Sequence, residues 1–301
     1  MPEKHVAVVG AVNLDIWGQS FDALIARDSN PGTVRLSLGG VGRNICHNLR
    51  LLGAETKFLT AIGDDGWGAQ IAQSCRDLGI NLDRAIFVPG GRTSSYLCVS
   101  GPDGDLALGI SDTDIAAHIT PQILLENLDF LNSASLVVFD GNLTEQAMEA
   151  LAQNVTAPLF VDPVSVTKAK KLCGILSKIH TIKPNSLEAE VLTGEKSPER
   201  AALALHRAGV RRVFVSDGPN GIFACEGSEV FHTPCFPCKL ENATGGGDAA
   251  MAALCRAFLD GQNLSQSAKT ALAAGAIAVS GEETINPTLS VSAIEKIIKT
   301  A

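Results

Sequence analysis

Short runs of apolar and β-branched residues alternate with longer Ala- and Leu-rich segments along most of the chain. The short runs lie at 5–10, 56–63, 134–140, 157–162, 179–184 and 211–218. The helical segments predicted between most of them lie at 44–52, 67–78, 144–153, 187–192 and 198–208. Apolar strands separated by crossover helices are typical of a parallel sheet that is covered on both faces. The pattern therefore predicts an α/β fold.

Two regions break this rhythm with short polar–apolar alternations and turns rich in Gly, Pro, Asp and Ser, at 16–38 and 87–110. Such alternation predicts a small antiparallel sheet inserted at one end, with lid segments at about 16–38 and 87–112. The last third predicts a hairpin over 223–234 and then helices only, at 247–259, 264–280 and 290–300. Because no repeat or linker interrupts the chain, we expect a single domain over 1–301.

Composition and charge narrow the function classes. The chain has 301 residues, 46% hydrophobic and 19% charged, which is typical of a folded protein. Its 24 basic and 32 acidic residues give a net charge of −8 without a basic run, which argues against nucleic-acid binding. The opening MPEKHVAVVGAVNLD lacks the apolar core of a signal peptide, and the longest uncharged apolar run, 271–279, is too short to cross a bilayer. We expect a cytoplasmic protein without a membrane partner, and the eight scattered cysteines are interpreted as reduced thiols.

The strongest local motif is NATGGGD, which ends in Gly245, Gly246, Gly247 and Asp248 and runs directly into the helix-forming sequence AAMAALCRAFL. Glycines let successive backbone N–H groups converge, and a helix N-terminus adds partial positive charge, so the motif suits a phosphate group. Asp248 is placed to face that cradle. The alternative is a tight turn in which Asp248 only caps the helix.

Two further segments carry polar groups beside glycines. Gly39 and Gly40 open GGVGRN before a predicted helix, and this spacing is not that of the dinucleotide fingerprint. Glycine there would let substrate hydroxyls approach the backbone, and Asn44 offers both a donor and an acceptor; a plain glycine-rich helix entry is the alternative. Asn13 and Asp15 follow the first strand and point to one side of an extended segment, so they are candidates to bind a vicinal diol. Alternatively, Asp15 only solvates the turn.

KPNSLEAE at 183–190 places Asn185 and Glu188 three residues apart at the start of a helix. An amide and a carboxylate on one face suit a hydrated Mg²⁺, which keeps waters and takes few protein ligands. The same spacing also describes a capping box, and the sequence leaves both interpretations open.

Absent motifs remove other enzyme classes. The chain has no GxxxxGK[ST], HExxH or GxSxG, so Walker-type NTPases, zincins and esterases lose support. Cys235 and Cys238 have a CxxC spacing near Cys225 and His232. Because a second CxxC is missing, a zinc-binding interaction module is the weaker interpretation.

Taken together, these segments resemble the ribokinase-like carbohydrate kinases, also called the phosphofructokinase-B family. GGVGRN at 39–44 is similar to the first family signature, NATGGGDA at 242–249 to the second, usually DTxGAGD, and residues 185–188 match its NxxE motif. The match extends from GAVNLD at 10–15 to the C-terminal helices. The resemblance implies a three-layer α/β/α core with a mostly parallel sheet and a small inserted β-sheet lid.

The resemblance also implies an ATP- and Mg²⁺-dependent phosphotransferase and a role for each matching residue. Asp248 would be the general base, and the amides of Gly245, Gly246 and Gly247 the anion hole. The residues implied to contact the acceptor's ribose are Asn13, Asp15, Gly39, Gly40 and Asn44. The residues implied to bind ATP are Asn185, Ser216, Asp217, Gly218, Thr244, Gly245 and Gly247. Asn185 and Glu188 are implied to hold Mg²⁺ through water. Asn242 and Thr244 are implied to bind a monovalent cation such as K⁺. Asn242 and Gly246 depart from the usual aspartate and alanine of the second signature.

Within the family, five stretches are most similar to kinases that act on the nucleoside pseudouridine: DSNPG at 28–32, VPGGRTSSYL at 88–97, VDPVS at 161–165, HTIKPNSLEAE at 180–190 and NPTLS at 286–290. The resemblance thus implies transfer of the γ-phosphoryl group of ATP to the 5′-hydroxyl of pseudouridine. Pseudouridine is a C-glycoside whose N1 keeps a hydrogen, so a suitably placed acceptor would reject uridine. The polar lid candidates for that acceptor are Ser29, Asn30, Thr93 and Ser94.

Two alternatives to this function remain open: a family member that phosphorylates another nucleoside or a sugar, and a catalytically idle sugar- or nucleotide-binding sensor. The exposed strand edge of a small lid sheet also predicts a homodimer formed through the lid.

Overall fold

An eight-stranded sheet forms the centre of the protein, in the order β14-β13-β12-β11-β10-β9-β1-β4. The computed structural model describes residues 5–300, so the first four residues of the opening segment lie outside it. The strands of this sheet are β1 (His5–Val9), β4 (Glu55–Leu59), β9 (Leu136–Asp140), β10 (Leu159–Asp162), β11 (Thr181–Ile182), β12 (Arg212–Ser216), β13 (Ile222–Cys225) and β14 (Val230–Thr233). All neighbours from β4 to β12 pair parallel, and only the hairpin β13–β14 adds antiparallel pairs at one edge. The predicted α/β class is confirmed.

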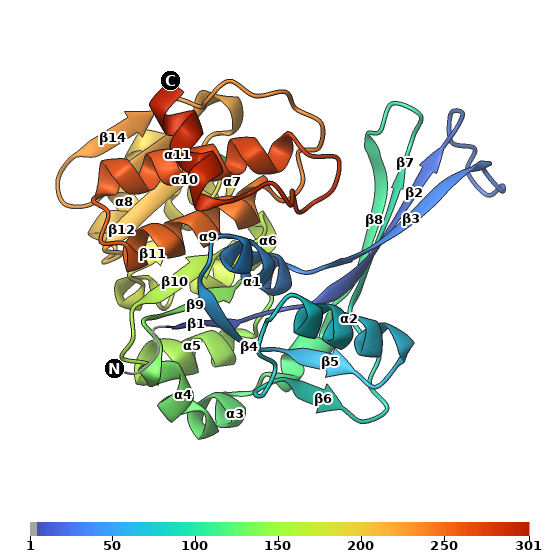
Figure 1. Cartoon of the computed structure of the whole chain (residues 1–301), viewed down its shortest axis with the longest axis horizontal. Coiled ribbons are helices and arrows are strands. Elements are labelled where there is room, and N and C mark those ends of the chain that lie inside the picture. The colour runs from blue at the N-terminus through green and yellow to red at the C-terminus, as the bar shows by residue number, and fades with distance from the viewer. Residues whose placement is uncertain (1–4, 301) are drawn as a thin grey trace.

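Helices cover both faces of the large sheet (Figure 1). They are α1 (Val41–Leu51), α2 (Gly66–Asp77), α3 (Pro121–Glu126), α4 (Leu128–Ser133), α5 (Glu145–Asn154), α6 (Val166–Ala169), α7 (Ser186–Thr193), α8 (Pro198–Arg207), α9 (Gly246–Leu259), α10 (Leu264–Val279) and α11 (Val291–Thr300). Short 3₁₀ helices span Asp114–His118, Lys170–Leu172, Leu176–Lys178 and Gly218–Asn220.

The alternation of side chains along each strand divides the core between the two faces. Val8 of β1 belongs to a buried cluster with Ile45 of α1 and Met251 of α9. Its neighbour Val9 belongs to a second cluster, with Met148 of α5 on the other face. Both faces of the central strands are therefore apolar, as the uninterrupted hydrophobic runs predicted.

A second, four-stranded sheet stands away from the main body (Figure 1). Its order is β3 (Gly32–Gly39), β2 (Asn13–Ser20), β7 (Ser95–Ser100) and β8 (Leu106–Asp112). The outer pairs are antiparallel, but the central pair β2–β7 is parallel, so the expectation of a wholly antiparallel sheet was wrong. The reason is that β2 and β7 belong to separate hairpins whose pairing is long-range in sequence.

Other boundaries also differ from the sequence pattern. The run 56–63 is two strands, because β5 (Ala61–Gly63) leaves the large sheet after Thr60 and pairs with β6 (Ile86–Val88). The short helices α3, α4 and α6 were not predicted, since segments of four to six residues are too short to show helical periodicity.

Among residues 5–300, the helices are all too short or too polar to span a lipid bilayer.

Candidate active site

Charged residues stand at the carboxyl ends of neighbouring central strands, where parallel strands place them along one edge. Asp140 ends β9, Asp162 ends β10 and Lys183 follows β11. The buried Asp140 accepts hydrogen bonds from the backbone amides of Ala11 at 2.9 Å and Asn142 at 2.8 Å. Burial raises the pKa of Asp140, although these hydrogen bonds oppose the rise. Asp140 therefore fixes the turn that follows β1, where the candidate ribose contacts begin.

The glycine triplet opens helix α9 in a conformation that requires glycine. Gly245 has a φ of 86°, and a Cβ at this position would lie 2.0 Å from the carbonyl oxygen of Thr284. Gly246 and Gly247 are the first helical residues, whose amides have no acceptor within a helix. Among residues 5–300, the backbone amides of the triplet Gly245–Gly247 make no hydrogen bond to another segment. The start of α9 thus leaves backbone donors available to an anion.

Asp248 is the third residue of α9 and is not its N-cap. That position belongs to Gly245, and no side chain within residues 5–300 caps the helix, so the alternative in which Asp248 only caps is not observed. The partly exposed Asp248 accepts a hydrogen bond from Asn44 Nδ2 at 2.9 Å. Burial raises its pKa to about 7, the negative charge of Asp162 adds to the rise, and the Asn44 hydrogen bond and Lys183 oppose it. A carboxyl group with such a pKa can exchange a proton near neutral pH.

The candidate ribose contacts lie on one connected path that leads to Asp248. Asn13 Nδ2 donates to Asp15 Oδ1 at 2.7 Å, and Asn13 pairs with Gly39 across β2 and β3. A Cβ at Gly39 would lie 2.0 Å from Asp15 Oδ2, so any larger residue at this position would have to displace that carboxylate. The amide of Asn44 donates to the carbonyl oxygen of Gly40 at 2.8 Å. The structure therefore brings together residues that are far apart in sequence.

Two side chains in this path carry polar groups that burial has removed from water. The Oδ1 atom of Asn44 is buried and accepts no hydrogen bond from residues 5–300, while its Nδ2 donates to Asp248. Burial raises the pKa of Asp15 to about 6, opposed by the Asn13 hydrogen bond and the charge of Arg43. A buried acceptor and a desolvated carboxylate are groups that substrate hydroxyls can satisfy.

Lys183 and Asp162 form a buried ion pair that sequence reasoning missed. Their N–O distance is 3.1 Å, and their side chains are 6% and 8% exposed. Burial alone would lower the pKa of Lys183, but Asp162, Glu188 and Asp248 raise it above its usual value. A Cβ at Gly247 would lie 3.4 Å from Lys183 Nζ, so the cation reaches the start of α9. The lysine adds positive charge beside the glycine amides.

Asp162 also holds a strained residue. Val164 has a φ of 70°, a region that β-branched residues rarely adopt, and its amide donates to Asp162 Oδ1 at 2.9 Å. Strain of this kind persists where surrounding contacts hold it, often at functional sites. It marks the end of β10 as part of the site.

Asn185 and Glu188 form the capping box that the sequence left open. The amide of Glu188 donates to Asn185 Oδ1 at 2.8 Å, and the amide of Asn185 donates to Glu188 Oε2 at 2.9 Å. Burial raises the pKa of Glu188. Both side chains therefore support α7, and their role toward Mg²⁺ stays a prediction.

The candidate nucleotide residues lie at the end of β12. Ser216 Oγ donates to the carbonyl oxygen of Pro184 at 3.4 Å, next to Asn185. Asp217 precedes the 3₁₀ turn at Gly218 and accepts from Asn220 Nδ2 at 3.0 Å. This loop therefore lies beside the start of α7.

The candidate cation loop is held by Asn242. Its Oδ1 accepts from the amide of Thr244 at 2.8 Å, and its Nδ2 donates to the carbonyl oxygen of Glu282 at 3.0 Å. The side chain thus ties together the two loops that flank the start of α9, a function that needs no ion.

The four candidates for base recognition lie in different places. Ser29 and Asn30 belong to the exposed loop between β2 and β3, where Asn30 accepts from the amide of Ile25 at 2.8 Å. Thr93 Oγ1 donates to Asp65 Oδ1 at 2.6 Å, so this hydroxyl already has a partner. Ser94 Oγ is buried and has no hydrogen-bond partner among the residues that the structure describes. The structure does not bring the four together.

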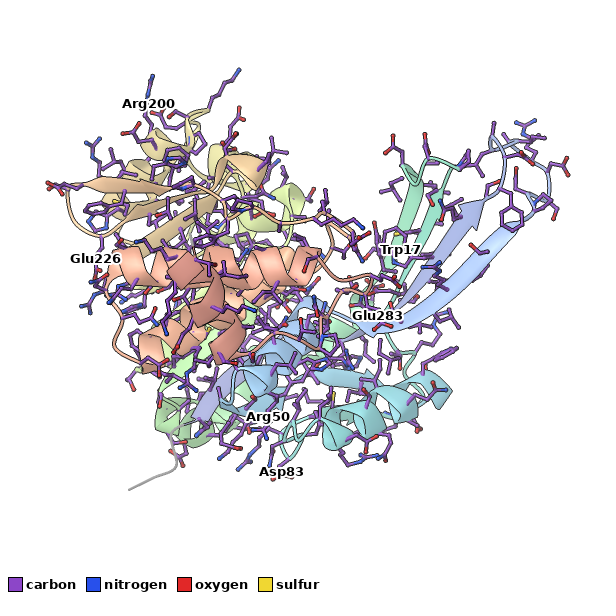
Figure 2. The ribbon with its side chains drawn as sticks, turned by 45° about the horizontal axis from the view of Figure 1, so that its top comes forward. Trp17, Arg50, Asp83, Arg200, Glu226 and Glu283 are labelled. Atoms are coloured by element: carbon purple, nitrogen blue, oxygen red, sulfur yellow. The ribbon has the colours of Figure 1, made fainter. Side chains whose placement is uncertain are left out.

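A cleft of about 680 Å³ separates the small sheet from the body. Figure 2 shows Trp17 on the side of the small sheet that faces the body, across from Glu283. The body side of the cleft includes Asn242 and Thr244, immediately before the glycine triplet. The cleft therefore leads to the start of α9.

Within residues 5–300 no three or more His, Cys, Asp or Glu side chains gather as they would around a metal ion. His232 Nε2 instead lies 2.8 Å from the carbonyl oxygen of Asn220, and Cys225 is buried. The zinc-module interpretation thus finds no support in this part of the chain.

The chain belongs to the pfkB family of carbohydrate kinases, whose family model matches residues 3–290. It is therefore a phosphotransferase with an alcohol group as acceptor. It is 36% identical over 310 aligned residues to pseudouridine kinase of Escherichia coli, covering 100% of this chain and 99% of the relative. It is 37% identical over 297 residues to the uncharacterized sugar kinase YeiI of the same species, covering 96% and 82%.

The fold agrees with a solved ribokinase. The structure of Arabidopsis thaliana ribokinase complexed with ribose and ATP matches with a TM-score of 0.87 at 22% identity, over 99% of each chain. This likeness confirms the ribokinase-like fold.

Proposed function

We propose that the protein transfers the γ-phosphoryl group of ATP to the 5′-hydroxyl of pseudouridine, giving pseudouridine 5′-phosphate and ADP. The observation that carries the proposal is the position of Asp248, beside the free amides of the glycine triplet and held by Asn44. The full-length similarity to an E. coli pseudouridine kinase supports this acceptor.

On the acceptor side, Asn13, Asp15 and the glycines at 39–40 bind the ribose hydroxyls. Asn44 Oδ1, which has no hydrogen-bond partner in the described part of the chain, accepts from one of them. The 5′-hydroxyl then lies against Asp248. In the loose transition state of phosphoryl transfer the proton leaves late, so a carboxylate with a pKa near 7 suffices as base.

On the donor side, the amides of Gly245, Gly246 and Gly247 donate to the equatorial oxygens of the transferring group, and the dipole of α9 adds positive potential. Lys183 supplies a full charge at the same place. The nucleotide lies along the loop at Ser216, Asp217 and Gly218.

Mg²⁺ fits this site because it keeps most of its waters and needs few protein ligands. When bound to the phosphates, it neutralises charge on the leaving side. Glu188 and Asn185 would hold its waters: one carboxylate oxygen of Glu188 is not used by the capping box. A bound K⁺ near Asn242 and Thr244 is proposed from the family resemblance alone.

The rate should depend on pH through Asp248. A general base must be ionised, so with a pKa of about 7 we expect kcat/KM for the acceptor to fall about tenfold for each pH unit below that value. Asp15, whose pKa is raised to about 6, steepens the fall at lower pH. Steady-state rates measured from about pH 5 to about pH 9 check this expectation. A rate that stays level down to pH 5 would contradict it.

We further propose a homodimer formed through the small sheet. The face of this sheet turned away from Asp15 carries Val34, Leu108 and Ile110, each more than half exposed. A contiguous apolar face of this kind is typical of a protein interface. Sedimentation equilibrium would then give twice the mass of the chain.

The substrate is tested by ADP release with Mg-ATP and, in parallel, pseudouridine, uridine and free ribose. The proposal predicts turnover with pseudouridine at a kcat/KM well above that for uridine or ribose. The similarity to a sugar kinase makes ribose the second candidate acceptor. A clear preference for ribose would make ribose the acceptor in place of pseudouridine. If none of the three acceptors supported ADP release, the result would favour a catalytically idle sugar- or nucleotide-binding sensor.

A further inference from the structure

Trp17 and Arg35 form a pair on the small sheet to which the proposed function assigns no role. Asn13, Asp15 and Trp17 alternate along β2, so their side chains leave the same face of the sheet. Arg35 of β3 is the register partner of Trp17. The pair therefore continues the face that carries the candidate ribose contacts, and both residues line the cleft.

Neither residue has a partner that would explain it structurally. Trp17 is 36% exposed, and within residues 5–300 its ring makes no aromatic or cation–π contact and its indole N–H donates no hydrogen bond. The described chain also offers Arg35 no ion pair. A large aromatic ring and a guanidinium without partners, side by side in a cleft, are typical of a surface that a ligand completes.

The position of the pair indicates which part of a ligand it meets. Trp17 lies two residues beyond Asp15 on the same strand face, about 7 Å further from the ribose contacts. The opposite wall carries Thr244, next to the glycine triplet, as well as Glu282 and Glu283. For an acceptor that binds its ribose at Asp15, Trp17 is therefore the next side chain along the same strand face.

We propose that Trp17 and Arg35 form a subsite for the base of a nucleoside acceptor, in which the indole stacks on a planar heterocycle and the guanidinium donates to an exocyclic carbonyl oxygen. This inference rests on the proposed function and adds the base-recognition residues. Stacking is sequence-tolerant because every base has a π-face, whereas the donors of Arg35 favour bases with carbonyl oxygens, such as uracil.

A competing role for Arg35 is a closing contact of the small sheet with Glu282 or Glu283 across the cleft. Those two glutamates have no ion pair within the described chain either. A closing contact would serve every acceptor alike, because it does not touch the base. The two roles are therefore separated by comparing a nucleoside with a free sugar.

The first test compares KM values of the Trp17→Ala variant for pseudouridine and ribose. Loss of a base–aromatic stack should raise KM for pseudouridine about 5- to 150-fold. Ribose has no base, so its KM should change far less. Trp17→Phe should recover much of the loss, and Trp67→Phe is the matched control, because Trp67 lies on α2 outside the cleft.

The second readout needs no turnover. Trp17 and Trp67 are the only tryptophans, so the Trp67→Phe protein reports on Trp17 fluorescence alone. Titration with pseudouridine should quench this fluorescence, and titration with ribose should not. Arg35→Lys keeps the charge but loses the planar fork, so its KM should rise for pseudouridine more than for ribose.

Three outcomes would overturn the inference. Equal changes for pseudouridine and ribose in the Trp17→Ala and Arg35→Lys variants would assign the pair to closure of the small sheet. Nucleoside turnover by the wild type without quenching of Trp17 would place the base elsewhere and leave the proposed function intact. A wild type that phosphorylates ribose but no nucleoside would remove the proposed function together with this subsite.

Discussion

Replacing Asp248 with asparagine should lower kcat with pseudouridine by about 10² to 10⁴, the usual contribution of a general base. The substitution is isosteric, and an asparagine oxygen can still accept the hydrogen bond from Asn44. The amides of the glycine triplet do not depend on the carboxylate, so the KM for ATP should change little. Coupled ADP release with saturating Mg-ATP measures both constants.

The matched control for this variant is Asp260→Asn. Asp260 caps the opposite end of the same helix and pairs with Arg256 near the surface. This variant should keep the wild-type rate. If Asp248→Asn also keeps it, Asp248 does not take the proton, and the carboxylate only supports the local structure.

Replacing Lys183 with methionine should lower the free energy of unfolding by about 3–5 kcal/mol, because it leaves the buried Asp162 without its counter-charge. The same change removes the cation beside Gly247, so kcat should fall as well. Urea denaturation followed by circular dichroism measures the stability, and ADP release the rate.

Two further variants separate the effect of the unpaired charge on Asp162 from the effect of removing a lysine. Lys183→Met combined with Asp162→Asn removes both charges and should regain much of the stability but not the rate. Lys299→Met removes a lysine of a largely exposed pair and should cost little of either. A loss of stability for Lys183→Met no greater than that for Lys299→Met would show that solvent reaches Asp162 and replaces the ion pair.

The fold could be predicted from the sequence where one physical signal dominates. Buried parallel strands require apolar runs, which are visible in the sequence. The helices α9, α10 and α11 are long enough to show helical periodicity, and the hairpin β13–β14 also shows its pattern locally. The parallel pairing of β2 with β7 could not be predicted, because it joins segments about 80 residues apart that carry no local signal of orientation. The split at Thr60 was hidden because buried apolar residues continue on both sides of it, Phe58 and Leu59 before it and Ala61 and Ile62 after it.

The candidate site shows the same division. Glycines before a helix and an acidic residue behind them are local signals, so Gly245–Gly247 and Asp248 were found. Asp140, Asp162 and Lys183 were missed because each stands singly at the end of a hydrophobic run. The sequence did carry a signal for these three residues. Burying a charged residue at the carboxyl end of a strand costs free energy unless the charge is paired, so such a residue is a candidate for a functional site.

Some patterns serve two purposes that spacing cannot separate. Asn185 and Glu188 have the spacing of a capping box and of a family motif, and the structure shows the capping hydrogen bonds. Trp17 gave no signal in the sequence because a single tryptophan in a strand is ordinary. Only the tertiary structure shows that it lines a cleft.

The central claim is that the glycine triplet and Asp248 deliver a phosphoryl group to a primary alcohol. Phosphorus NMR of the product formed from Mg-ATP and pseudouridine tests it most directly. We predict one new monoester whose phosphorus couples to the two 5′-hydrogens, and no product from 5′-deoxypseudouridine. A phosphate on a ring hydroxyl, or the same product yield from the 5′-deoxy compound, would contradict the assignment.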